Sequence, residues 1–331
     1  MGTVQQQVEE FKRDYTLIQN EVRKVIVGQQ DVLDGVMAGM LGGGHCLLEG
    51  VPGLGKTKMV HALAESLDLS FSRIQFTPDL MPSDIIGTNM IVEDQQGRKH
   101  FEFQPGPVFG NILLADEINR ATPKTQSALL EAMQEGHVTV AKRQHQIDRP
   151  FFVLATQNPL EMEGTYPLPE AQLDRFLFKL RVPFPTRAEL HAIVTRTTHG
   201  GEATIQPVVG KARIFAMIAL AAECEAAPHI VDTAIQIIEA THPEHQTAPP
   251  ISKKYIRFGA SPRGGQAIIR TAKVLALRAG RYAIADQDVY DVVKPALRHR
   301  IILNFEGEAE NIDRDLILDE IVDVIRKKKR I

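Results

Sequence analysis

The sequence predicts an α/β core, in which helices flank a parallel sheet, followed by an all-helical second domain. Three observations support this. A glycine-rich loop lies between a short apolar run and a helical pattern, and a second apolar run ends in two acids. At residues 182–187, alternating strand and helix patterns give way to helices alone. Prolines stiffen that segment, so we divide the chain into residues 1–185 and 186–331.

The glycine-rich loop, residues 50–57, matches the phosphate-binding pattern G-x-x-x-x-G-K-[ST] without a mismatch. Its glycines let backbone N–H groups surround phosphate oxygens, and the N-terminus of the following helix adds partial positive charge. Lys56 would reach the β- and γ-phosphates of a nucleotide, and the Thr57 hydroxyl would ligate Mg²⁺. The predicted strand at 45–49 and helix at 58–67 argue against a glycine turn that matches by chance. The residues expected to contact the nucleotide here are Gly50, Pro52, Gly53, Leu54, Gly55, Lys56, Thr57 and Lys58.

The composition of the chain argues against several classes of function. The chain has 331 residues, 44% of them hydrophobic and 24% charged, and its net charge of −3 does not indicate a generally basic surface for nucleic acid. No stretch reaches the roughly 18 apolar residues of a membrane span, and the polar N-terminus does not resemble a secretory signal. We therefore expect a cytoplasmic protein. Its two cysteines, Cys46 and Cys224, lie far apart in the sequence, which favours buried free thiols.

Two helices are predicted before the loop, at residues 4–26 and 31–41. The first has an apolar side that consists of Val8, Phe11, Tyr15, Ile18, Val22 and Val25. Between the helices, Val27 and Gly28 could cover the adenine face of a nucleotide, because glycine lets the backbone come close to the ring. An ordinary helix break at Gly28 explains the residue type equally well.

An insertion is predicted after the first core helix. Residues 71–76 alternate like a strand, and two prolines indicate a loop at 77–84. Residues 85–103 then indicate a hairpin with strands at 89–92 and 100–103. A hairpin on such a core can contact a partner or substrate, or it can be an ordinary surface excursion, and the residues favour neither.

The second apolar run, residues 111–117, ends in Asp116 and Glu117. Such a run predicts a buried parallel strand with carboxylates at its C-terminal end, where ligands bind in open α/β sheets. Asp116 would hold Mg²⁺, and Glu117 would polarise the attacking water. An acid pair at a strand end is often merely solvated, but the phosphate-binding loop upstream favours the functional interpretation.

Further along the core, a helix opens at Thr122 and Pro123 and ends at Gly136. Residues 137–147 indicate a second hairpin with a basic turn at 142–143.

Two candidate site residues lie next to the last predicted core strands. The strand at 151–156 precedes Asn158, whose amide could orient the attacking water or could merely form a turn before a proline. Arg175 precedes a short apolar strand at 176–178. It could be a structural ion-pair partner, or an arginine finger that acts on the nucleotide of a neighbouring subunit.

The second domain shows helical patterns at residues 188–198, 214–224, 231–241, 264–278 and 288–299. Arg263 stands at the start of one helix, after Ser261 as cap and Pro262 in the first turn. A cation there opposes the helix dipole, which favours an anionic partner such as phosphate over plain exposure. The basic tail, residues 326–330, is expected to be a solvated end, with an acidic or nucleic-acid partner as the lesser alternative.

Six segments together resemble the MoxR family of AAA+ ATPases. They are GVPGLGKT (50–57), FTPDLMPSDIIG (76–87), FQPGPVFGNILLADEINRA (103–121), ATQNP (155–159), EGTYPLPEAQLDRF (163–176) and SPRG (261–264). The segments are spread over most of the chain, and several are highly specific. The resemblance implies an AAA+ P-loop NTPase core with a helical lid, and a ring that is usually hexameric. It also implies a helix-2 insert at the first hairpin and a pre-sensor-1 hairpin at the second.

The resemblance also assigns roles to single residues. The Walker A pair is Lys56 and Thr57, and the Walker B pair is Asp116 and Glu117. Sensor 1 is Asn158, the arginine finger is Arg175 and sensor 2 is Arg263. The lid is displaced in this clade, so Arg263 could act on the nucleotide of its own subunit or of a neighbour. Arg120 is a further candidate for the subunit interface.

The resemblance implies a Mg²⁺-dependent ATPase that works as a ring-shaped chaperone or remodeller of a partner protein. Similar proteins often act with von Willebrand factor A domain proteins in the insertion of metal cofactors. A DNA or RNA motor on the same core is the main alternative. The basic residues at 142–143 and the basic tail favour a motor, whereas the net charge of −3 and the lack of tryptophan oppose it. A nucleotide-gated scaffold without turnover is the third class, and Glu117 and Asn158 argue against it.

Overall fold

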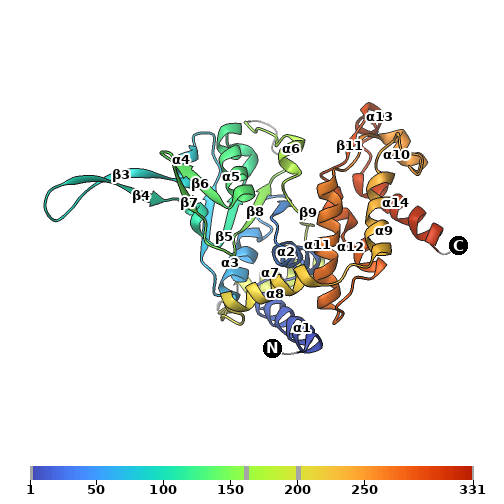
Figure 1. The fold of residues 1–331 in the computed structure, drawn as a ribbon, viewed down its shortest axis with the longest axis horizontal. Coiled ribbons are helices and arrows are strands. Elements are labelled where there is room, and N and C mark those ends of the chain that lie inside the picture. Colours follow the sequence, from blue (N-terminus) through green and yellow to red (C-terminus); the bar gives the residue numbers. More distant parts are fainter. Residues whose placement is uncertain (1–2, 160–163, 199–202, 330–331) are drawn as a thin grey trace.

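The computed structural model describes residues 3–159, 164–198 and 203–329. A five-stranded sheet lies in the core with helices packed against it, and a helical lid follows in the chain (Figure 1). In Figure 1 the larger part of the lid occupies one end of the molecule and a long hairpin projects from the other. The predicted α/β core with hairpin inserts and a helical lid is therefore confirmed.

The sheet has the strand order β2-β5-β8-β1-β9, and all neighbouring strands are parallel. Its strands are β1 (Cys46–Glu49), β2 (Phe71–Gln75), β5 (Ile112–Asp116), β8 (Phe152–Gln157) and β9 (Phe178–Arg181). Apolar runs form these strands because both faces of the sheet are covered. Cys46 and Leu48 belong to one hydrophobic core, and Leu47 between them belongs to the other.

The last strand begins later than the sequence predicts. A strand is expected at 176–178, whereas β9 starts at Phe178. The carbonyl groups of Phe176 and Leu177 accept hydrogen bonds from His299 and Arg300 of the lid. Contacts with the lid thus take the place of the first part of the predicted strand.

Helices α1 (Val4–Val22), α2 (Gln30–Leu41) and α3 (Lys56–Ser66) contribute to the hydrophobic core on one face of the sheet. The predicted apolar side of α1 is buried as far as Val22, but the helix ends before the predicted limit at residue 26. Residues 23–25 form a turn, and Gly28 and Gln29 then have positive φ values of 68° and 53°. A left-handed backbone cannot continue a right-handed helix, so the chain changes direction here.

The first hairpin consists of β3 (Gly87–Glu93) and β4 (Lys99–Pro105), which are longer than the predicted strands. Its ladder pairs Ile91 with Phe101, and both side chains are exposed, to 64% and 72%. The projecting part of the hairpin therefore carries apolar side chains that the rest of this chain does not cover.

The loop predicted at 77–84 is only partly correct, because helix α4 (Pro82–Ile86) begins inside it. Pro82 suits the first position of a helix, where its missing N–H is not needed. The Asp84 carboxylate accepts a hydrogen bond from the backbone N–H of Met81 at 2.8 Å, which secures the start of the helix.

Helix α5 (Pro123–Glu135) leads into the second hairpin, which consists of β6 (His137–Val140) and β7 (Arg143–Gln146). The turn lies at Ala141 and Lys142, with φ values of 47° and 66°, and not at 142–143 as predicted. Two successive residues with positive φ match the twist of a two-residue hairpin, which leaves Arg143 in the ladder. The two hairpins meet where the rings of Phe103 and His145 stack with centroids 3.7 Å apart.

The lid is helical apart from a two-stranded ribbon, in which β10 (Ile256–Phe258) pairs antiparallel with β11 (Ile302–Leu303). Its helices are α7 (Arg187–Thr198), α8 (Lys211–Glu223), α9 (Pro228–Ala240), α10 (Pro250–Tyr255), α11 (Pro262–Arg278), α12 (Asp286–Leu297), α13 (Phe305–Ala309) and α14 (Arg314–Lys329). Short helices within the core are η1 (Pro107–Phe109), η2 (Ile118–Arg120) and α6 (Glu170–Leu173). No helix in the described parts of the chain is long and apolar enough to cross a membrane.

The basic tail forms the last turn of α14 at residues 326–329. Residues 327–329 are exposed, as predicted, whereas Arg326 is partly covered and lies over the ring of Tyr290. Arg330 lies outside the described residues. One hydrophobic core runs from α1 through the sheet into the lid, and the domain boundary after residue 185 stays a prediction.

His45 joins three core elements just before β1. Its Nδ1 accepts a hydrogen bond from the Val153 N–H of β8 at 3.0 Å, and its Nε2 lies 3.1 Å from the Met133 carbonyl of α5. This pattern requires a neutral ring in which Nε2 donates. Burial lowers the pKa of His45 from 6.5 to about 4, so the ring stays neutral in the folded protein down to that pH.

We expect the protein to lose stability as the pH falls from about 6.5 to about 4. In this window the unfolded chain takes up a proton at His45 that the folded chain does not bind, so protonation favours unfolding. The loss attributable to His45 should approach about 3 kcal/mol and level off below pH 4. Urea unfolding across this range should show a smaller loss for His45→Gln than for the unchanged protein. Equal losses in both proteins would contradict the assignment.

Candidate nucleotide site

The glycine loop follows β1 and forms an open cradle. Gly53 and Gly55 have positive φ values of 83° and 76°, and no atom lies within 4 Å of where a side chain would start at either residue. The loop can therefore surround a ligand with backbone N–H groups, as phosphate binding requires. Its last residues, Lys56 and Thr57, open helix α3, whose N-terminal N–H groups and dipole also favour an anion.

Lys56 connects the loop with the acidic strand end. Its Nζ donates to the Gly50 carbonyl at 2.6 Å, which holds the amine beneath the loop. Burial lowers the pKa of Lys56, and the negative charges of Asp116 and Glu117 partly offset this effect. The loop at the end of β1 and the acids at the end of β5 therefore belong to one electrostatic site.

The Asp116 carboxylate is held from two sides. One oxygen lies 2.7 Å from an Nη atom of Arg73 on β2, and the other accepts a hydrogen bond from the Thr156 hydroxyl at 2.7 Å. The Thr156 oxygen in turn accepts from the Glu117 N–H at 2.8 Å. These bonds fix the orientation of the strand end, and the sequence analysis did not identify Arg73 or Thr156.

Glu117 has a positive φ of 56°, so the chain turns sharply after β5 and redirects this side chain. Its carboxylate accepts from the Gln75 amide at 2.8 Å and lies 3.0 Å from an Nη atom of Arg120. Arg120, which the resemblance suggested for a subunit interface, therefore has a partner within its own chain.

The donor set fits a divalent cation with a preference for oxygen ligands. The Asp116 carboxylate and the Thr57 hydroxyl are hard oxygen donors of the kind that Mg²⁺ takes, with phosphate oxygens and waters completing its shell. Asn158 is 5% exposed and lies just after β8, the strand between β5 and β1. The three strand ends therefore bring the predicted residues to the same edge of the sheet.

A cleft of about 920 Å³ adjoins the glycine loop. The predicted residues that line it are Val27, Pro52, Gly53, Leu54, Gly55 and Lys58. Apolar side chains that the sequence analysis did not assign to the site form much of its remaining wall: Val25, Ile26, Phe184, Pro185, Leu190 and Ile193. A flat apolar cleft beside a phosphate cradle suits a nucleotide base. Phe184 is 69% exposed, and an aromatic residue between two prolines was the available signal for it.

Gly28, predicted to approach the base, does not line this cleft. A side chain at Gly28 would come within 1.9 Å of the Glu189 carboxylate of α7, so the close approach is to α7. The next residue, Gln29, donates from its amide to the Leu54 carbonyl at 2.7 Å and thereby fastens the glycine loop. Gly28 thus lies outside the cleft, whereas Gln29 lies in its wall and holds the loop.

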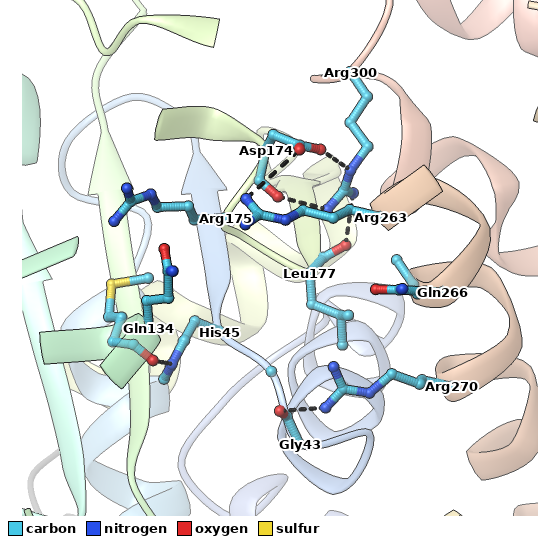
Figure 2. Close-up of a pocket in the computed structure, with 13 residues that line it drawn as sticks. Gly43, His45, Gln134, Asp174, Arg175, Leu177, Arg263, Gln266, Arg270 and Arg300 are labelled. Carbon is cyan, nitrogen blue, oxygen red and sulfur yellow. Dashed lines mark hydrogen bonds and ion pairs between the residues drawn. The ribbon is translucent and has the colours of Figure 1, made fainter. Parts of the chain in front are cut away.

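The two remaining predicted site residues, Arg175 and Arg263, lie together in a different cavity of about 270 Å³ (Figure 2). Arg270 and Arg300 also line it, and Asp174 is its acidic residue. Arg263 and Arg300 are directed at the Asp174 carboxylate, whereas Arg175 donates to the Leu130 carbonyl at 3.1 Å and Arg270 donates to the Gly43 carbonyl. Such a cavity suits a highly charged anion.

This arginine cavity lies at the opposite end of the sheet from the glycine loop. Its wall includes residues 43–45, which precede β1, whereas residues 50–57 follow β1. The four residues of β1 span roughly 13 Å. No residue of the glycine loop lines the arginine cavity, so the described chain does not place Arg175 and Arg263 beside its own cradle.

The start of α11 differs from the expectation in its hydrogen bonding. Ser261 occupies the cap position, but its hydroxyl donates to the Asp174 carboxylate at 2.9 Å and does not cap the helix. Arg263 lies 3.7 Å from the same carboxylate and is nearly half exposed. Its anionic neighbour in this chain is therefore Asp174, and the guanidinium keeps room for a further anion.

Comparison with known proteins agrees with this layout. A profile of the "ATPase family associated with various cellular activities (AAA)" matches residues 45–178, and an "AAA lid domain" profile matches residues 249–321. The crystal structure of a "putative ATPase" from Cytophaga hutchinsonii is similar with a TM-score of 0.89 at 39% identity, over 96% of both chains.

Curated relatives match most of the chain. "Chaperone MoxR1" from Mycobacterium tuberculosis is 43% identical over 305 residues, which are 92% of this chain and 80% of that protein. "Protein MoxR" from Paracoccus denitrificans is 32% identical over 296 residues, which are 85% of this chain and 86% of that protein. Since these matches run through both the nucleotide site and the lid, the chain belongs to the MoxR family of AAA+ ATPases.

Proposed function

We propose that the protein is a Mg²⁺-dependent ATPase that binds its nucleotide at the glycine loop. The phosphates would lie in the cradle of residues 50–57, and the base would enter the 920 Å³ cleft beside Val27 and Phe184. The open cradle, the buried Lys56 and the two fixed carboxylates support this assignment. Mg²⁺, held by Thr57 and Asp116, would neutralise charge on the β- and γ-phosphates.

The residues of this chain would divide the work of hydrolysis. Lys56 binds the phosphates and stabilises the charge that develops on them, because its ammonium is held beneath the loop. Glu117 polarises the attacking water, and Asn158 orients it from the neighbouring strand end. Gln75 and Arg120 hold the Glu117 carboxylate in this structure, so Glu117 must be released or shared when water binds.

The distance between the glycine loop and the arginine cavity supports the proposal that several subunits cooperate. Arg175 and Arg263 lie at the amino end of the parallel sheet, while the glycine loop lies at its carboxyl end. One chain therefore offers a nucleotide site at one end and a set of arginines at the other. A ring in which each arginine cavity faces the next nucleotide would complete every site, and a hexamer is the expected ring. An arginine supplied in trans contributes ~10³ to 10⁵ in rate.

We infer the function of such a ring from the relatives of this chain and from its exposed surface. The relative from Mycobacterium tuberculosis is named a chaperone, and the β3–β4 hairpin exposes apolar side chains such as Ile91 and Phe101. We therefore infer that the ring remodels a partner protein. A von Willebrand factor A domain partner, a role in metal-cofactor insertion and a cytoplasmic location stay predictions.

Two substitutions should separate binding from hydrolysis. Glu117→Gln removes the group that polarises water but leaves the cradle, so ATP should still bind while turnover falls at least ~100-fold. Lys56→Ala should weaken ATP binding itself, because a charge-assisted contact with the phosphates is lost. Fluorescent-nucleotide titration and phosphate release measure the two effects. Unchanged turnover in Glu117→Gln would show that the protein is a scaffold rather than an ATPase.

Arg175→Ala tests the shared site. Specific ATPase activity of the unchanged protein should rise with chain concentration, because subunits must meet to complete a site. Added Arg175→Ala subunits should lower the activity by more than their share, since each one leaves a neighbouring site without its arginine. Turnover per chain that is independent of concentration, with inhibition in simple proportion, would exclude catalysis in trans.

A further inference from the structure

Asp174 immediately precedes the predicted arginine finger and is bound by two groups from the lid. Its carboxylate accepts a hydrogen bond from the Ser261 hydroxyl at 2.9 Å and from Nε of Arg300 at 2.8 Å. Ser261 opens α11, and Arg300 follows the end of α12. Figure 2 shows Arg263 and Arg300 both directed toward Asp174.

Arg300 is almost completely buried, with 3% of its side chain exposed, and its donors are all directed at the chain itself. Besides the Asp174 carboxylate, it binds the carbonyl of Phe176 at 2.7 Å and that of Leu177 at 3.1 Å. It also donates to the carbonyl of Asp174 at 3.1 Å and to that of Ala296 in α12. A guanidinium with this many partners has one orientation, so it fixes residues 174–177 in place.

Neighbouring residues extend the same attachment. Nε2 of His299 lies 3.0 Å from the Phe176 carbonyl, and Nη1 of Arg298 donates to the Lys179 carbonyl at 3.0 Å. Three consecutive residues after α12 therefore hold backbone carbonyls on both sides of the start of β9. The lid is attached here to the segment that carries Arg175, independently of the covalent link at residues 182–187.

The Asp174 carboxylate also reduces the repulsion between neighbouring arginines. Four arginines line the cavity, and their like charges would repel one another without a nearby anion. Asp174 touches Arg300 directly and lies 3.7 Å from Arg263. One negative charge thus lets Arg263 and Arg300 approach the finger segment and gives both a defined direction.

We propose that Asp174, held by Arg300 and Ser261, is a positioning residue that aligns Arg175 and Arg263 as one unit for the nucleotide of the neighbouring subunit. The lid of a subunit then carries that subunit's own arginine finger, and a rotation of the lid moves the finger relative to the next site. This inference rests on the proposed function, because it requires that Arg175 acts in trans.

A complementation experiment tests the position of the finger separately from the chemistry of the site. Glu117→Gln subunits have an inactive site but an intact finger, and we call them finger donors. Arg175→Ala subunits have an intact site but no finger, and we call them site donors. A mixture of the two should recover ATP turnover that neither has alone, because a finger donor can complete the site of its neighbour.

Asp174→Asn is then added to one kind of subunit at a time. In the finger donor, the substitution should lower the recovered turnover at least about tenfold, because a small displacement of a catalytic group has a large effect on rate. In the site donor, which has no finger to position, the recovered turnover should change less than about twofold. A general defect in folding or assembly would lower turnover in both arrangements, so equal losses would overturn the proposal.

Asp315→Asn provides a matched control. The Asp315 side chain is 18% exposed, close to the 19% of Asp174, and it pairs with Arg298 of the lid at 2.9 Å. It does not touch residues 174–177, so the finger donor that carries Asp315→Asn should still complement fully. A loss equal to that of Asp174→Asn would show that any weakening of the lid is sufficient, and would overturn the specific role of Asp174.

The outcomes also separate this inference from the proposed function. If finger and site donors without further substitutions fail to complement while they still assemble together, catalysis in trans is wrong and the role of Asp174 fails with it. If they complement and Asp174→Asn in the finger donor has no effect, the shared site stands and the positioning role is wrong.

Discussion

The parallel direction of the five strands decides where every charged group of this protein lies. Parallel strands bring all their carboxyl ends to one edge, so the loop after β1, the acids after β5 and Asn158 after β8 meet there without any long-range pairing of their own. The same constraint sends whatever precedes a strand to the other edge. Arg175 precedes β9, and it is therefore separated from the cradle of its own chain by the length of the sheet.

The two edges of the sheet differ in the charged groups that are held together there. At the carboxyl edge, an amine and two carboxylates are close together, and each is held by a neutral or oppositely charged partner. At the amino edge, four arginines line one cavity, and two of them, Arg263 and Arg300, are directed at a single carboxylate. The first edge is suited to a metal with phosphates and the second to an anion from elsewhere. Under the proposed function, one chain contains two halves of a site that assembly would join.

The lid belongs structurally to the arginine edge. Arg298, His299 and Arg300 hold carbonyl groups of the segment before and within β9, and Ser261 holds the side chain next to Arg175. The nucleotide cleft, in contrast, is bounded by α7 and by Phe184 in the linker between core and lid. A change in the cleft can therefore reach the arginines through the lid, because the same helical unit contacts both.

Local sequence determined the parts of this protein that depend on short stretches of backbone. The glycine cradle, the buried strand that ends in two acids, and the hairpins follow from residues that are neighbours in the chain, since turn and strand preferences act over a few positions. The tertiary structure decided what joins them. Asp174 meets Arg300 across 126 positions and Ser261 across 87, and no local pattern encodes such pairs. Likewise, Phe184 and the apolar side of α7 became cleft residues only when packing placed α7 beside the loop, because cleft walls are made of surfaces from separate elements.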